Sequence, residues 1–208
     1  MLFGDSEKEG FVRGQRYSHA GLGITFTFPD GFDIDNRTEA VLGARASDNA
    51  AIRFDGVDVP AGTSLSSYVA SGWVEGLDTN TIRALTVNGM SAVSARATAD
   101  QWDFDITVIR AGKSVYRILT AMPRGAPELE ALAATVRNSF RRLSAEERSS
   151  LKPLTLRVVE AQSGESARTL AARMQGVSRP LELFLILNGM KPGESIEPGR
   201  SYKVISES

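Results

Sequence analysis

This 208-residue chain contains few residues of the types that act in catalysis or bind metal ions. It contains a single histidine, His19, and no cysteine. Zinc hydrolysis of the H-E-x-x-H kind needs two histidines one helical turn apart, a further ligand and a glutamate base. A site made of carboxylates alone is a poor environment for zinc. The sequence therefore argues against an intact zinc peptidase, and we expect His19, in a glycine-flanked loop, to be exposed or to lie at an interface.

Other catalytic arrangements also lack the partners that they need. Asp103 and Asp105 share one side of a predicted strand and could pair for acid–base catalysis. They alternate with Trp102 and Phe104, so we expect the two carboxylates on a solvated outer face. A serine triad requires a histidine that only His19 could supply, and no G-x-S-x-G motif is present. A hydrolase that works through carboxylates is left without a supporting motif.

Two further patterns are better explained by folding than by ligand binding. Gly21 and Gly23 lack the third glycine and the strand–turn–helix context of a dinucleotide-binding loop, so they predict a turn. Tyr68 and Trp73 share the stripe of a predicted helix with Leu65, which indicates core packing rather than a ligand box.

Composition excludes several classes of protein. A net charge of −1 argues against a nucleic-acid binder, and 42% apolar with 24% charged residues is ordinary for a globular protein. No apolar run reaches the roughly 18 residues of a transmembrane helix. The segment Met1–Ser6 is not a signal peptide, because no basic region precedes an apolar one. The lack of cysteine leaves the compartment open, so the chain is either cytosolic or a fragment of something longer.

The most informative stretch, residues 155–208, predicts the order strand, helix, helix, strand. Leu156, Val158 and Ala161 alternate as in a half-buried strand. A turn follows, and a residue just after it is placed to cap a helix with its side-chain oxygen. The turn is Ser163-Gly164, the capping residue is Glu165 or Ser166, and the apolar stripe of the helix is Leu170, Ala171 and Met174.

A second helix is predicted to begin at Arg179-Pro180, because proline is tolerated in the first turn of a helix. Asn188-Gly189 ends it with a pair that suits the left-handed C-cap. Pro198-Gly199 then turns the chain into a closing strand at Tyr202–Ile205. The residues that this helix should bury are Leu181, Phe184, Leu185 and Leu187.

This arrangement resembles the LysM glycan-binding module. S-G-E-S at 163–166 stands where that family has S-G-D-T, and Leu187-Asn188-Gly189 matches its leucine-asparagine-glycine. Ile196 with Pro198-Gly199 matches its isoleucine-x-proline-glycine. Two features depart from the pattern: Ala167 replaces a larger apolar residue, and the segment that leads to Leu187 is longer than usual.

The resemblance implies that N-acetylated glycans, such as those of peptidoglycan, bind in a shallow groove between two loops. Here these loops are Gly164–Ala167 and Asn188–Ile196. The residues expected to contact the glycan are Ser163, Gly164, Glu165, Ser166, Asn188, Gly189, Met190, Lys191 and Ile196. The alternative is that these residues only form turns and caps.

The region from 21 to 143 predicts an antiparallel sheet packed with helices, an α+β fold. Ile24–Phe28 alternates as a strand, and Asn88-Gly89 between two such runs suits a type I′ hairpin. Consecutive strands joined by such short loops must be antiparallel. Pro127–Phe140 is a strongly amphipathic helix, with Arg141 following at its C-terminal end.

Polar segments divide the chain. Residues 1–20 are polar and punctuated by glycine, which predicts a loosely packed arm or a linker. Residues 144–154 read as a second linker that starts with a capping box at Ser144–Glu147 and ends at a proline. The predicted domains are thus 21–143 and 155–208.

The larger domain resembles PsbP-like domains, a family that includes non-enzymatic accessory proteins. The matching segments are I-T-F-T-F-P-D-G-F, V-N-G-M-S-A, V-Y-R-I-L and S-F-R-R-L. With G-D-S-E-K-E-G-F-V-R-G-Q-R-Y-S-H at 4–19, nearly the whole chain resembles the C-terminal half of HtpX-type zinc metalloendopeptidases of the bacterial cell envelope.

That resemblance implies a non-catalytic region in the periplasm or cell envelope. Zinc and the H-E-x-x-H motif would belong to a peptidase domain that is missing from this sequence, and that domain would be the partner of the residues seen here. A weak contact with peptidoglycan would raise the effective concentration of the enzyme near its targets. The alternative is a free-standing protein-interaction module that binds no glycan.

Overall fold

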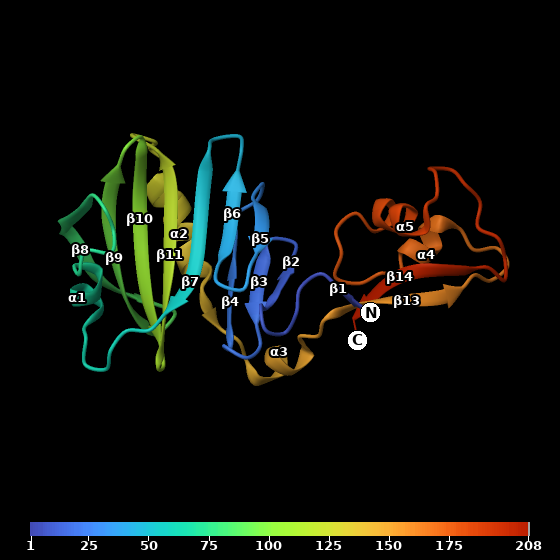
Figure 1. Ribbon diagram of the computed structural model, residues 1–208, viewed down its shortest axis with the longest axis horizontal. Helices are drawn as coiled ribbons and strands as arrows, with labels where there is room; N and C mark the ends of the chain where they lie inside the picture. Colours follow the sequence, from blue (N-terminus) through green and yellow to red (C-terminus); the bar gives the residue numbers. More distant parts are fainter. Residues whose placement is uncertain (208) are drawn as a thin grey trace.

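The computed structural model describes residues 1–207, which form an α+β fold with three antiparallel sheets (Figure 1). The predicted α+β class is confirmed. The largest sheet has seven strands in the order β5-β6-β7-β11-β10-β9-β8. These strands are β5 (Asp33–Asn36), β6 (Val41–Arg45), β7 (Ala50–Val57), β8 (Leu77–Val87), β9 (Met90–Ala99), β10 (Trp102–Ala111) and β11 (Ser114–Pro123).

The other sheets are smaller. One has the order β12-β4-β3-β2, and the other has the order β1-β13-β14. Their strands are β1 (Leu2–Phe3), β2 (Phe11–Arg13), β3 (Arg16–His19), β4 (Ile24–Thr27), β12 (Arg141–Arg142), β13 (Leu154–Glu160) and β14 (Ser201–Glu207). The helices are α1 (Leu65–Val69), α2 (Leu129–Ser139), α3 (Ala145–Ser150), α4 (Ala167–Ala171) and α5 (Pro180–Asn188).

Both faces of the seven-stranded sheet carry hydrophobic cores. One face packs against α2 and the four-stranded sheet, with Phe26, Phe54 and Phe140 among its buried residues. The opposite face packs against α1 through residues such as Val69 and Val108. The central strands are therefore buried on both sides, like the middle layer of a three-layer structure.

Residues 1–20 differ from the predicted loose arm. β1 pairs with β13, while β2 and β3 extend the sheet that contains β4. Phe11 and Tyr17 are only 1% and 3% exposed. The prediction was wrong because strands of two to four residues are too short to show a period, and their partners are distant in sequence.

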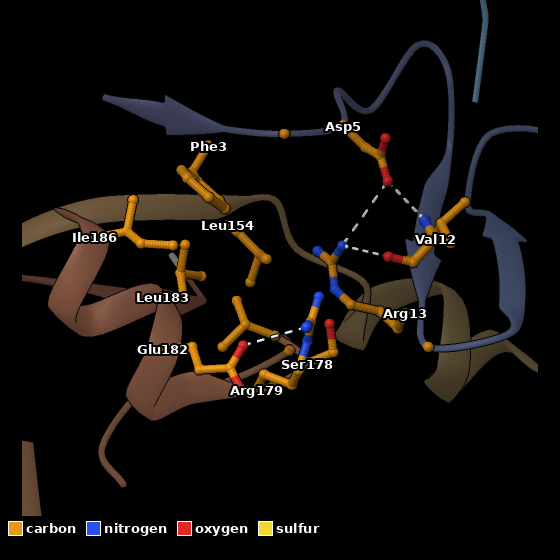
Figure 2. A pocket seen from close by; sticks show the side chains of 14 residues that line it. Phe3, Asp5, Val12, Arg13, Leu154, Ser178, Arg179, Glu182, Leu183 and Ile186 are labelled. Carbon is orange, nitrogen blue, oxygen red and sulfur yellow. Dashed lines mark hydrogen bonds and ion pairs between the residues drawn. The ribbon is translucent and has the colours of Figure 1, made fainter. Parts of the chain in front are cut away.

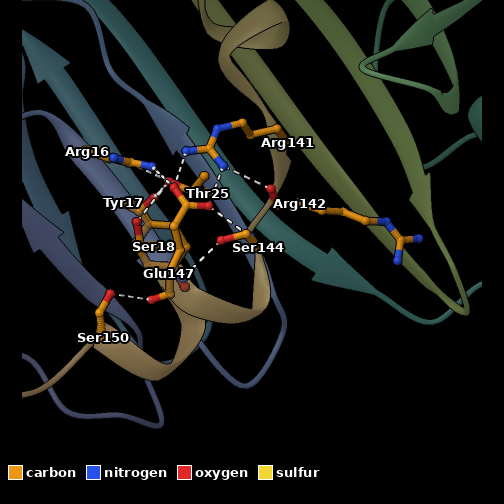
Figure 3. A network of polar contacts seen from close by, with 9 residues as sticks. All are labelled: Arg16, Tyr17, Ser18, Thr25, Arg141, Arg142, Ser144, Glu147 and Ser150. Atoms are coloured by element: carbon orange, nitrogen blue, oxygen red, sulfur yellow. Dashed lines mark hydrogen bonds and ion pairs between the residues drawn. The ribbon is translucent and has the colours of Figure 1, made fainter.

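The segment between the two predicted domains forms α3, which begins with the expected capping box of Ser144 and Glu147. The same Glu147 carboxylate accepts hydrogen bonds from Arg16 at 3.1 Å and from Arg141 at 2.8 and 2.6 Å (Figure 3). Arg141 lies in β12 rather than at the end of α2, because the helix stops at Ser139. The helix α3 is thus fastened to the four-stranded sheet.

The C-terminal part has the element order β13, α4, α5, β14, with its own hydrophobic core around Leu170, Phe184 and Tyr202. Ser166 caps α4 by accepting the Thr169 N–H, and Pro180 occupies the first turn of α5, as predicted. Val158 departs from the half-buried strand pattern, since 64% of it is exposed. Its neighbour Val159 packs on the core instead, so Val158 lies on the face of the strand that points away from the helices.

Candidate functional site

The two loops expected to bind glycan emerge from the same end of the β13–β14 pair, on the right in Figure 1. Their bases are joined by backbone hydrogen bonds. The N–H of Ala161 donates to the carbonyl of Arg200 at 2.9 Å, and the N–H of Gly199 donates to the carbonyl of Ala161 at 2.8 Å. These bonds extend the strand pairing by one step, just before the first loop begins and just after the second loop ends.

The first loop is held by its own side chains. The Glu165 carboxylate accepts the Gln162 N–H at 2.8 Å and also forms an ion pair with Arg173 of the following turn. Gly164 has a φ of +82°, which favours glycine. Ser163, Gly164 and Ser166 are exposed, whereas Glu165 is half-buried and already engaged. The structure therefore gives Glu165 a role in ordering the loop.

The second loop starts at Asn188, whose amide is fully used. Its Nδ2 donates to the carbonyls of Phe184 and Lys203, both at 2.9 Å, and its Oδ1 accepts the Lys203 N–H at 2.7 Å. Gly189 has a φ of +62°, and its N–H donates to the Ile186 carbonyl at 3.2 Å. The Asn188 side chain therefore holds the end of α5 against the outer edge of β14.

The remaining predicted residues of this loop are divided between core and surface. The N–H of Met190 donates to the Leu185 carbonyl at 2.9 Å, which completes a Schellman motif, and its side chain packs on the core. Ile196 is buried in the same core. Lys191 is exposed, and its N–H donates to Glu194. Only part of the predicted set is therefore free to contact a ligand.

A groove of about 540 Å³ lies beside this loop, along β14. It brings together two of the predicted residues, Asn188 and Gly189, but not Ser163–Ser166, Met190, Lys191 or Ile196. Sequence reasoning missed the rest of its lining. The exposure of Val158 could not be read from the alternating pattern, which predicts the opposite. The remaining lining residues are Val158, Leu187, Arg200, Ser201, Tyr202 and Lys203.

A second pocket, of about 420 Å³, lies between α5 and the N-terminal strands (Figure 2). Phe3 and Leu183 contribute apolar walls, and Ile186 at the rim is 75% exposed. On the opposite side, Asp5 accepts the Val12 N–H at 2.7 Å and lies 4.0 Å from the Arg13 guanidinium. The pocket combines an apolar wall with charges that are already paired.

His19 is engaged through both ring nitrogens. Its Nδ1 accepts the Leu22 N–H at 3.3 Å, which places the ring proton on Nε2, where it faces the Lys8 carbonyl at 3.1 Å. Residues 1–207 contain no group of three or more His, Asp, Glu or Cys side chains that could hold a metal ion. The side chains of this part of the chain do not fit the donor set of a catalytic zinc.

The expected solvated position of Asp105 is wrong. Asp105 is 3% exposed, because α2 covers its face of the sheet. Its carboxylate lies 3.4 Å from Arg96 and 3.6 Å from Arg137, and burial raises its pKa although these cations oppose the shift. Asp103 instead accepts the Gly125 N–H and the Thr98 hydroxyl, which lower its pKa. The two carboxylates serve separate structural contacts.

The other patterns have structural roles. Trp73 lies beyond the end of α1 and is half-buried; its Nε1 donates to the Tyr68 carbonyl at 3.0 Å. The Arg117 guanidinium stacks 4.5 Å from the Trp73 ring centre and binds both oxygens of Asp55. Gly23 closes a turn with a φ of +67°, as predicted.

No protein-family model matches the sequence, and no curated protein matches it significantly. In structure, the chain is similar to a protein of Bacteroides thetaiotaomicron, with a TM-score of 0.50 at 7% identity over 89% of this chain and 65% of that one. It therefore spans about two thirds of that protein's length. This likeness concerns the fold alone.

Two other solved structures are similar over a smaller part of the chain. The cyanobacterial PsbP protein CyanoP of Synechocystis sp. PCC 6803 covers 67% of this chain and 98% of its own, at 14% identity and a TM-score of 0.47. LpqN, involved in cell envelope biogenesis of Mycobacterium tuberculosis, covers 58% of this chain and 83% of its own, at 14% identity and a TM-score of 0.38. None of the helices within residues 1–207 is long and apolar enough to cross a lipid bilayer.

Proposed function

We propose that this chain is the non-catalytic accessory region of an HtpX-type zinc metalloendopeptidase of the bacterial cell envelope. In this proposal, residues 155–207 form a LysM-like module that binds peptidoglycan weakly. The PsbP-like domain and its N-terminal strands pack on the peptidase domain or present substrates to it. Zinc would be held by the H-E-x-x-H motif of that peptidase domain, outside this chain.

One observation carries the proposal: the backbone that enters the first loop and the backbone that leaves the second loop are hydrogen-bonded to each other, at Ala161 and Gly199. Ser163, Gly164 and Ser166 of the first loop and Lys191 of the second are exposed. Exposed polar groups held on a rigid base are suited to a weak, shallow contact with a polymer. A weak second contact is sufficient for the proposed tether, since it acts through effective concentration.

The test is co-sedimentation of the purified chain with insoluble peptidoglycan, together with titration of chito-oligomers to millimolar concentration. We expect a measurable bound fraction, and the absence of binding to both would reject the tether. The same preparation with added zinc should not hydrolyse casein. Clear hydrolysis would reject the accessory role.

A second candidate, a protein-interaction module without glycan binding, is favoured by the pocket between α5 and the N-terminal strands. Ile186 at its rim is 75% exposed and continues the apolar wall of Phe3 and Leu183, and such a contiguous apolar patch is typical of a contact surface. Ile186→Asp should weaken binding to a separately produced peptidase domain and leave peptidoglycan sedimentation unchanged. If Ile186→Asp instead weakened peptidoglycan sedimentation and left binding to the peptidase domain unchanged, the glycan tether alone would be favoured.

A further inference from the structure

We propose that the groove along β14 binds a saccharide that carries a carboxylate, and that Lys203 and Arg200 recognise the negative charge. This inference rests on the proposed function, because it names the class of glycan that the same module would prefer. It assigns recognition to a surface to which only Asn188 and Gly189 of the predicted loop residues contribute.

The floor of the groove follows from the pairing of β13 with β14. Lys203 lies opposite Val158, and both backbone polar groups of Lys203 are bonded to Asn188 on the side away from β13. The Val158–Lys203 pair is therefore of the type without mutual hydrogen bonds, in which opposed Cα atoms lie only about 4.5 Å apart. Val158 and the aliphatic stem of Lys203 thus form a continuous apolar strip.

The walls of the groove leave this strip accessible. Leu187 contributes a partly buried side chain, and a Cβ built on Gly189 would meet no atom within 4 Å. The Tyr202 ring is buried, and its hydroxyl oxygen accepts the Glu197 N–H at 3.0 Å. An apolar floor with open sides is suited to the flat face of a sugar ring and to an N-acetyl methyl group.

The charges of the groove point to an anion. Its lining residues include Arg200 and Lys203 and no aspartate or glutamate. Arg200 is held over the Tyr202 ring at 5.7 Å and pairs with Glu197 at 3.1 Å, outside the lining. Lys203 is exposed, and its ammonium takes part in no ion pair within residues 1–207. A desolvated carboxylate would give it a charge-assisted hydrogen bond.

The charges of the groove differ from those of the pocket of Figure 2. There, Arg13 and Arg179 are matched by Asp5 and Glu182, so the net charge of the lining is balanced. A single-stranded nucleic acid is a poorer candidate for the β14 groove, because the Tyr202 ring is buried and offers no face for base stacking. An acidic saccharide uses both the apolar strip and the cations.

The experiment compares chitohexaose with the same oligomer oxidised at C6 to carry carboxylates, each titrated into the 208-residue chain. At about 50 mM salt, where surface charges are weakly screened, we expect the acidic oligomer to bind roughly tenfold more tightly. Lys203→Gln should reduce this preference to near unity, and Arg200→Gln should reduce it in part. Both backbone bonds to Asn188 are kept in Lys203→Gln, so its fold should be unchanged.

The matched control is Arg157→Gln, which removes an exposed cation of β13 that does not line the groove. It should leave the preference intact. Equal binding of both oligomers, or an undiminished preference in Lys203→Gln, would overturn this inference while leaving the proposed function in place. Equally tight binding of a single-stranded oligonucleotide would also overturn it. If neither oligomer binds, the proposed function fails first.

Discussion

The side chain of Asn188 pairs with both backbone polar groups of Lys203, at 2.7 Å for the N–H and 2.9 Å for the carbonyl. In doing so it takes the place of a neighbouring strand along the outer edge of β14. A third bond, to the Phe184 carbonyl, satisfies an acceptor in the last turn of α5. One amide therefore closes a sheet edge, caps a helix and positions one wall of the groove.

The first prediction concerns this amide. Asn188→Asp keeps the acceptor for the Lys203 N–H but replaces the amide donor with a carboxylate that faces two carbonyl oxygens at a helix C-terminus. We expect a loss of about 1–3 kcal/mol in the free energy of unfolding of the C-terminal part. Urea denaturation followed by the NMR signals of Tyr202 and its neighbours in the C-terminal part measures it. A loss equal to that of the exposed control Glu194→Gln would contradict the role given to Asn188.

The second prediction concerns pH and Glu147. The hydrogen bonds from Arg141 and from the Ser144 backbone hold the pKa of Glu147 far below its ordinary value of 4.5. The unfolded chain then binds more protons than the folded chain as the pH falls below 4.5, so the stabilisation by Glu147 is present above that pH and is lost on acidification. Glu147→Gln should lower stability at pH 7 and flatten the acid limb of the stability profile. Denaturation between about pH 3 and 7 tests this, with Glu146→Gln as the control that should retain the slope.

The third prediction concerns Asp105, whose effect on the pH dependence of stability has the opposite sign to that of Glu147. Burial raises the pKa of Asp105, so its contribution to stability is present below the ordinary value of 3.8 and is lost as the pH rises through the raised pKa. Asp105→Asn should remove that slope. At pH 7 the variant should be at least as stable as the original protein, because burial disfavours the charged form of Asp105 by more than Arg96 and Arg137 favour it. Thermal unfolding at several pH values gives both quantities, and an unchanged pH profile would contradict the prediction.

The turns and helix caps that depend on neighbouring residues could be predicted from the sequence. Asn88-Gly89 forms its hairpin with φ values of 45° and 79°, as a type I′ turn requires. The capping box at Ser144 and the proline-initiated helix at Pro180 are local in the same way. Each depends on hydrogen bonds or steric limits within four residues, which the sequence displays directly.

What the sequence could not predict depends on partners distant along the chain. Asp105 lies on the polar side of an alternating strand, but α2 returns to cover that side. Phe11 is buried within strands that are too short to show an alternating hydrophobic pattern. In the candidate site, the LysM resemblance pointed to Asn188, but its pairing with Lys203 of β14, 15 residues further on, could not be predicted from the sequence.

The fourth prediction concerns the contact between the two parts of the chain. The Arg13 guanidinium donates to the carbonyl of the preceding residue, Val12, at 3.1 Å and to the Lys152 carbonyl at 3.2 Å. The aliphatic stem of Arg13 lies against Gly176. Arg13→Ala should loosen the segment 150–153 and accelerate its cleavage in limited proteolysis several-fold. Arg179→Ala, which removes an exposed arginine from the same pocket, should not. Equal cleavage rates in all three proteins would contradict a pinning role for Arg13.

The last prediction separates loop ordering from sugar contact at Glu165. This carboxylate accepts the Gln162 N–H and pairs with Arg173, so its oxygens are already used inside the loop. If Glu165 acts by ordering the loop, Arg173→Ala should weaken chito-oligomer binding about as much as Glu165→Ala does, and the double variant should be no worse than either one. If Glu165 touched the sugar directly, Arg173→Ala would have the smaller effect and the two losses would add. Isothermal titration of the three variants against chitohexaose distinguishes these outcomes, because non-additivity is expected only where the two side chains act as one unit.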